Sequence, residues 1–129
     1  MNYLEEEINQ ALITLKIDYR GLETAELTAL IKTLTKTFFK SESNVLDPVE
    51  LNEKNVEHNP DFWKEINQRI HKKDLTLLVF DSTYTAWEIK GSENLVSILG
   101  ETTGFPFWVT DSEHTFLVHM DDHDCVIWA

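Results

Sequence analysis

The stretch LTLLVFDSTYTAWEI, residues 75–89, carries the strongest β-strand signal in this chain of 129 residues. Residues 75–80 are apolar and partly β-branched, a composition that favours a central strand. Residues 85–89 alternate between two sides with the period of two that strand side chains follow. Because the polar residues DSTY link the two segments, we expect a β-hairpin.

Three further strands are predicted after this hairpin, at residues 106–111, 116–120 and 125–128. The polar turns SEH and DDHD join them, and both turns contain residues that favour tight turns. A short helix that starts at Ser92 and ends at Gly100 or Gly104 separates these strands from the hairpin.

The N-terminal part of the chain has a helical period instead. Apolar residues three and four positions apart predict amphipathic helices at residues 3–16 and 24–40. A third helix is expected from Asn59, a suitable N-cap, to Lys73. Residues 41–59 are polar, contain Pro48 and lack a sustained period, so we interpret them as a long connection.

These elements follow in the order α-α-α-β-β-α-β-β-β. We therefore expect an α+β fold, an antiparallel sheet of about five strands with helices packed on one face. The length fits a single domain, residues 1–129, with a mainly helical part at 1–73 and a sheet part with one helix at 74–129. The hydrophobic content of 42% is enough to build a core.

The chain is strongly acidic. It has 23 Asp and Glu against 11 Lys and Arg, a formal net charge of −12 at pH 7. Residues 91–129 contain seven acidic residues and no Lys or Arg. This distribution argues against binding to nucleic acid or to an anionic membrane, both of which require clustered cations, and it favours a basic partner.

Targeting signals are not apparent. Cys125, the single cysteine, cannot form an internal disulfide, which favours a reducing compartment. The N-terminal residues MNYLEEEINQ lack the apolar segment of a signal peptide, and no apolar run approaches the roughly 20 residues that span a bilayer. We expect a cytoplasmic protein.

A metal site is one hypothesis for the C-terminal cluster. In an extended strand, His119, Asp121 and His123 would share a face, and imidazole and carboxylate groups suit Zn²⁺ or Fe²⁺. His114 could approach from a neighbouring strand end. However, the DDHD turn breaks the alternation and the spacing matches no established metal motif. We expect no metal or cofactor, and keep metal binding as an alternative.

Signals for catalysis are weaker. Cys125 lies beside three aspartates, whose negative charge disfavours a reactive thiolate, so we interpret it as structural. The four glycines are scattered singly, which does not match a phosphate-binding loop. The sequence predicts a protein that is not an enzyme.

A protein-binding surface is the remaining candidate. In FPFWV, residues 105–109, Phe107 and Val109 share one face of the strand and Trp108 takes the other. Unless a helix or the long connection covers it, Trp108 is an exposed aromatic anchor beside acidic loops. The predicted partner-binding residues are Trp108, Asp111, Glu113, His114, Asp121, Asp122, His123 and Asp124.

The C-terminal half resembles small bacterial immunity proteins of the polymorphic-toxin and contact-dependent growth inhibition type. The likeness rests on WEI at residues 87–89, ILGETTGF at 98–105 and FWVTDSEHTFLVHMDDHDCVIW at 107–128. It implies a non-enzymatic inhibitor that neutralises a cognate toxin domain by direct binding. No functional residue is carried over from the family.

Charge is compatible with this implication. A toxin such as a nuclease holds phosphates in a basic cleft, where the carboxylates of an acidic inhibitor could take their place. We therefore expect an immunity protein with a basic toxin domain as partner. The alternatives are a metal-binding protein or metal-dependent enzyme that uses the His/Asp cluster, and an adaptor protein of unknown partner.

Overall fold

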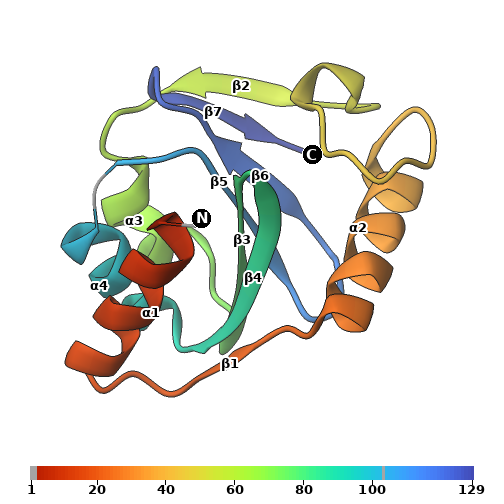
Figure 1. The fold of residues 1–129 in the computed structure, drawn as a ribbon. Coiled ribbons are helices and arrows are strands. Elements are labelled where there is room, and N and C mark those ends of the chain that lie inside the picture. Colours follow the sequence, from red (N-terminus) through yellow and green to blue (C-terminus); the bar gives the residue numbers. More distant parts are fainter. Residues whose placement is uncertain (1–2, 103) are drawn as a thin grey trace.

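Figure 1 shows the fold in a computed structural model, which describes residues 3–102 and 104–129. The described residues form helices and strands in this order: α1 (Tyr3–Thr14), β1 (Tyr19–Gly21), α2 (Thr24–Phe38), the short 3-10 helix η1 (Pro48–Glu50), β2 (Asn55–His58), α3 (Phe62–Arg69), β3 (Asp74–Asp81), β4 (Thr83–Lys90), α4 (Ser92–Glu101), β5 (Phe107–Asp111), β6 (Leu117–Met120) and β7 (Cys125–Trp128). The predicted α+β class is confirmed.

All the strands belong to one antiparallel sheet in the order β1-β4-β3-β5-β6-β7-β2. The predicted hairpin is confirmed and is slightly longer than expected, with β3 and β4 paired from Asp74↔Lys90 to Asp81↔Thr83. The predicted helix α4 and strands β5, β6 and β7 are also present. From residue 74 onward, the order of helices and strands predicted from the sequence is therefore the order observed.

The prediction of about five strands is wrong, because the described sheet has seven. Strand β1 interrupts the predicted helix–helix order between α1 and α2, and β2 lies inside the segment interpreted as a connection. Both are edge strands of three or four residues, paired with β4 and β7 respectively. Such short polar strands form because a longer strand offers them hydrogen bonds, which their own composition does not reveal.

The expectation of helices on one face is also wrong. Helices α1, α3 and α4 lie together on one side of the sheet, and α2 lies on the other (Figure 1). The reason is visible in β3, where Leu77 and Val79 contribute to one core while Leu78 contributes to the second. A sheet that is apolar on both faces must be covered on both faces.

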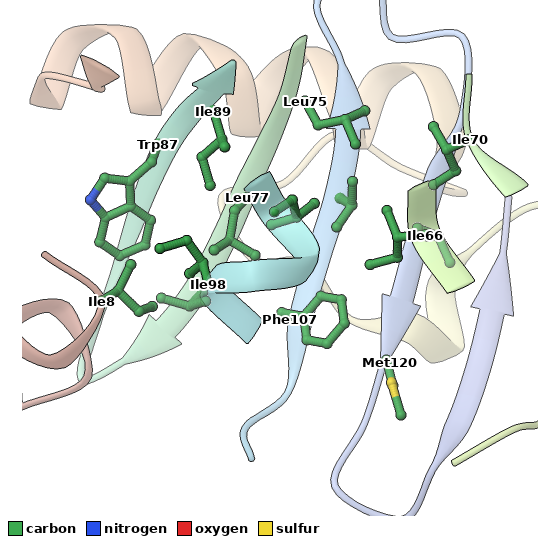
Figure 2. Close-up of a cluster of buried hydrophobic side chains, with 14 of the residues drawn as sticks. Ile8, Ile66, Ile70, Leu75, Leu77, Trp87, Ile89, Ile98, Phe107 and Met120 are labelled. Carbon is green, nitrogen blue, oxygen red and sulfur yellow. The ribbon is translucent and has the colours of Figure 1, made fainter. Parts of the chain in front are cut away.

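The first core fills the space beneath α1, α3 and α4. Figure 2 shows Ile8, Ile66 and Ile98 from these helices among the sheet residues Leu77 and Trp87. Trp87 is 2% exposed, and its indole N–H donates to Asn9 Oδ1 at 2.8 Å. This bond attaches α1 to the hairpin and satisfies a polar group that would otherwise be buried alone.

The second core lies between the sheet and α2. Residues 39–51 extend this layer, and Phe39 pairs with Leu51 in an isolated β-bridge that closes the segment. The segment buries Leu46, whose backbone N–H donates to the hydroxyl oxygen of Tyr84 on β4 at 2.9 Å. The long connection is thus a packed cover for the sheet.

Helix α3 is shorter than predicted. It begins at Phe62 and ends at Arg69. The start is later than predicted because Asn59 belongs to the preceding turn, where its side chain accepts a hydrogen bond from the Asp61 N–H at 3.1 Å. Among the described residues, none of the helices combines the length and apolar character that crossing a membrane requires.

Candidate protein-binding site

The β6–β7 turn, Asp121–Asp124, is held by its own first residue. Asp121 Oδ1 accepts the backbone N–H groups of His123 and Cys125, both at 2.9 Å. Asp124 adopts the left-handed conformation at φ 63°, which Asp tolerates better than most residues. With Asp121 used for structure, the side chains of Asp122 and His123 project outward and are 67% and 87% exposed.

A cavity of about 320 Å³ lies between this turn and helices α3 and α4. Its apolar lining includes Trp63 of α3, Phe105 after α4, and Phe107 and Met120 of the sheet. The carboxylates of the turn border it, so we name it the acidic cavity; its acidic members are Asp121, Asp122 and Asp124. An apolar floor with a charged rim is the anatomy of many protein-binding sites.

Gly100 allows the two helices beside this cavity to approach each other. A Cβ atom at this position would lie 3.2 Å from an atom of the Trp63 ring. The indole ring therefore packs directly on the α4 backbone. A glycine at residue 100 is thus part of how the floor of the acidic cavity is built.

No Lys or Arg lines the acidic cavity among the described residues. Outside the cavity lining, Lys64 Nζ lies 5.4 Å from the Trp63 ring centroid and 3.4 Å from Asp61 Oδ1. Lys64 therefore makes a cation–π contact with the Trp63 ring. The negative charge of the rim is not neutralised from within the cavity.

The eight predicted partner-binding residues do not form one surface. Asp111 ends β5, and Glu113 and His114 belong to the β5–β6 connection, all at the opposite end of β6 from Asp121–Asp124. The four residues of β6 separate the two ends by about 13 Å. Only Asp121, Asp122 and Asp124 line the acidic cavity, with His123 exposed beside them.

Asp111 has a structural role. Its carboxylate is 2% exposed, accepts the Thr115 N–H at 2.7 Å and the Thr115 hydroxyl, and lies 3.4 Å from Lys72 Nζ. Burial opposes its ionisation, but the two Thr115 hydrogen bonds and Lys72 outweigh burial and hold the pKa of Asp111 below its ordinary value. The Asp111 carboxylate thus stabilises the conformation of the β5–β6 connection through its hydrogen bonds to Thr115.

Replacing Asp111 by alanine is expected to lower the free energy of unfolding by about 1–3 kcal/mol, because it removes two hydrogen bonds that a buried, ionised carboxylate accepts from Thr115. Since the folded-state pKa is lowered, this contribution is present above the ordinary carboxyl pKa and is lost as the pH falls further. Urea denaturation at pH 7 measures the effect. Glu113→Ala, at an exposed position of the same connection, is the control, and equal losses in both variants would contradict this role.

Trp108 is not an exposed anchor. It is 5% exposed and packs against Phe39 with ring centroids 5.9 Å apart, beneath the segment that follows α2. Its second neighbour is His119, directly across the strand pair, with ring centroids 4.3 Å apart. The long connection covers the face of the sheet on which Trp108 lies.

The residues of the metal hypothesis are also separated. His119 lies on the α2 face between Trp108 and Ile127 in the strand register, whereas Asp121 and His123 belong to the turn. Within residues 3–102 and 104–129, no group of three or more His, Cys, Asp or Glu side chains has an arrangement able to hold a metal ion. Cys125 is half-buried at the start of β7.

Several residues of the acidic cavity were not found from the sequence, notably Trp63, Phe105 and Met120. They come from three separate elements, and their apolar character predicts burial equally well. The only local signal was the pair of glycines, Gly100 and Gly104, which both line the cavity.

Comparisons with known proteins give no assignment: no family model matches the chain, and neither a curated protein nor a solved structure matches it significantly.

Proposed function

We propose that this chain is a non-enzymatic immunity protein that binds a basic toxin domain through the acidic cavity and the β6–β7 turn. The observation that carries the proposal is the cavity itself, where the exposed carboxylate of Asp122 and the half-buried Asp121 and Asp124 border an aromatic floor. The absence of Lys and Arg from residues 91–129 supports it, because the cavity is built mainly from this part of the chain.

The chemistry of the cavity suits an Arg or Lys side chain of the partner. The aliphatic stem of such a residue would pack against Trp63 and Phe105, and its charged group would meet Asp122 and Asp124. Long basic side chains divide in this way between apolar and polar surroundings. Desolvated aromatic contacts supply affinity, while the surrounding negative charge speeds association and selects a basic partner.

This proposal narrows the predicted interface. Trp108 and Asp111 stabilise the fold, and Glu113 and His114 lie at the other end of the sheet. Asp122, His123 and Asp124 remain as the partner-facing members of the predicted set, joined by Trp63 and Phe105 from the cavity. Asp121 contributes by shaping the turn.

Reversing two charges tests the proposal. The partner to test is a toxin domain encoded by a neighbouring gene, if one is found there. The Asp122→Lys/Asp124→Lys variant is expected to bind it at least about 100-fold more weakly, because like charges across an interface cost several kcal/mol. Isothermal titration calorimetry and rescue of cells that express the toxin domain are the measurements. Glu50→Lys/Glu53→Lys makes the same change of charge at exposed positions in and after η1, and is expected to bind normally.

Two outcomes would contradict the proposal. Failure of the unmodified protein to bind or rescue would exclude immunity toward that toxin, and equal losses in both double variants would exclude the acidic cavity as the interface.

Charge steering also predicts that the association rate falls with salt, since exposed charges are screened within about 10 Å at 0.1 M ionic strength. A basic partner without toxin activity would point to the adaptor alternative.

A further inference from the structure

A second cavity, of about 370 Å³, opens on the α2 face of the sheet. One wall is Trp108 with His119, and the other is the cross-strand pair Phe80 and Tyr84, whose ring centroids are 4.9 Å apart. Val45, in the segment after α2, is part of the lining. Phe80 and Val45 are 60% and 54% exposed, so two large apolar side chains of this cavity are in contact with solvent.

His119 is the unusual member of this lining. Its side chain is 8% exposed, and its Nδ1 atom is buried without a hydrogen-bond partner among the described residues. An unpaired buried polar group costs free energy, and such groups are rare enough in folded proteins to require an explanation. The His119 side chain lines the wall of this cavity beside Trp108.

We propose that this cavity is a binding site for a small, neutral aromatic molecule that carries a hydroxyl group, in the chemical class of phenols. The aromatic walls provide the apolar surface for a planar ring, and the size lies within the range of about 300–1,000 Å³ that is usual for small-molecule sites. The hydroxyl group would form a hydrogen bond with the imidazole of His119, which lines the cavity.

A hydroxyl group suits the hydrogen-bonding properties of the His119 imidazole. In a neutral imidazole one ring nitrogen donates and the other accepts, and a hydroxyl group can do either. His119 is held neutral at pH 7 because burial lowers its pKa to about 4. Tyr84 offers a second polar contact, since its oxygen accepts from the Leu46 N–H and its own hydrogen stays available.

The uncharged lining of the cavity disfavours ionic ligands. None of the described lining residues carries a charged side chain, so an ion would lose its hydration without gaining a partner. An anion would in addition enter a protein with a net charge of −12. The cavity lies on the opposite side of the sheet from the acidic cavity, so this proposal does not depend on the proposed function.

Phenol and toluene are the matched probes, because they differ only in a hydroxyl or methyl group. Titration followed by NMR of the His119 and Trp108 side chains is expected to show saturable binding of phenol, at least about fivefold tighter than toluene, which is the effect of one net hydrogen bond. Phe80→Ala is expected to weaken phenol binding. Trp63→Ala, in the acidic cavity, should leave it unchanged.

His119→Phe keeps an aromatic ring beside Trp108 and removes both nitrogens. We expect this variant to bind the two probes equally. The proposal is overturned if phenol shows no saturable binding to the unmodified protein, if toluene binds as tightly as phenol, or if the preference survives in His119→Phe. Should that variant not fold, the imidazole ¹⁵N resonances of the unmodified protein decide, since saturating phenol must shift them by more than saturating toluene does.

Discussion

Replacing Trp108 by alanine is expected to lower the free energy of unfolding by about 3–5 kcal/mol, the usual cost of deleting a large aromatic side chain from a core. Trp108 is 5% exposed and lies in the central strand β5, between the strands that carry Leu78 and His119. It also contacts Phe39, where the chain leaves α2. Its loss would open a hole at the contact between the sheet and the segment that covers it.

Urea denaturation at neutral pH measures this loss, and Phe80→Ala is the matched control. Phe80 is an aromatic residue near the same cavity but is 60% exposed, so its truncation should cost less than about 1 kcal/mol. A Trp108→Ala protein that keeps its stability but no longer binds a partner would contradict the structure. That result would restore the sequence-based interpretation of Trp108 as a binding anchor.

The sequence predicted the centre of the sheet because the signals there are local. In residues 75–89, the apolar segment, the turn and the alternating segment each specify the hairpin without help from distant residues. The edge strands β1 and β2 are different, because their hydrogen bonds come from β4 and β7, far away in the sequence. A segment that is strand only by virtue of its partner has no strong signal of its own.

The position of α2 could have been predicted. The consecutive apolar residues Leu77, Leu78 and Val79 require cover on both faces of the sheet, whereas a sheet with helices on one face would alternate. The same reasoning applies to Trp108, which follows Phe107 and precedes Val109. Three adjacent apolar residues in the middle of a strand therefore indicate that a second layer covers the sheet.

The candidate site was only half predictable. The DDHD turn is recognisable from its residue types, and its exposed carboxylates follow from that conformation. The cavity below it depends on Trp63, far earlier in the chain, meeting Gly100 at close range. Such a contact is decided by how α3 and α4 cross, which sequence periodicity does not specify.

Lowering the pH from 7 to 4 is expected to remove about 3 kcal/mol of stability through His119 alone. Burial lowers the folded-state pKa of His119 from 6.5 to about 4, against the weaker opposing effect of the Asp121 carboxylate. Between pH 6.5 and about 4, His119 is protonated in the unfolded chain but neutral in the folded chain. Stability is therefore complete above about pH 6.5 and falls as the pH approaches 4.

The measurement must separate His119 from the carboxylates that titrate nearby. Free energies of unfolding from urea denaturation, taken from pH 7 to 4, should fall less in His119→Phe than in the unmodified protein, by the amount attributed to His119. His123→Gln removes a solvent-exposed histidine and should follow the unmodified protein. The Asp111 contribution is lost only at lower pH, since its folded-state pKa lies below the ordinary 3.8. Parallel curves for His119→Phe and the unmodified protein would mean that His119 is solvated when folded, which would also remove the polar feature on which the aromatic-ligand site depends.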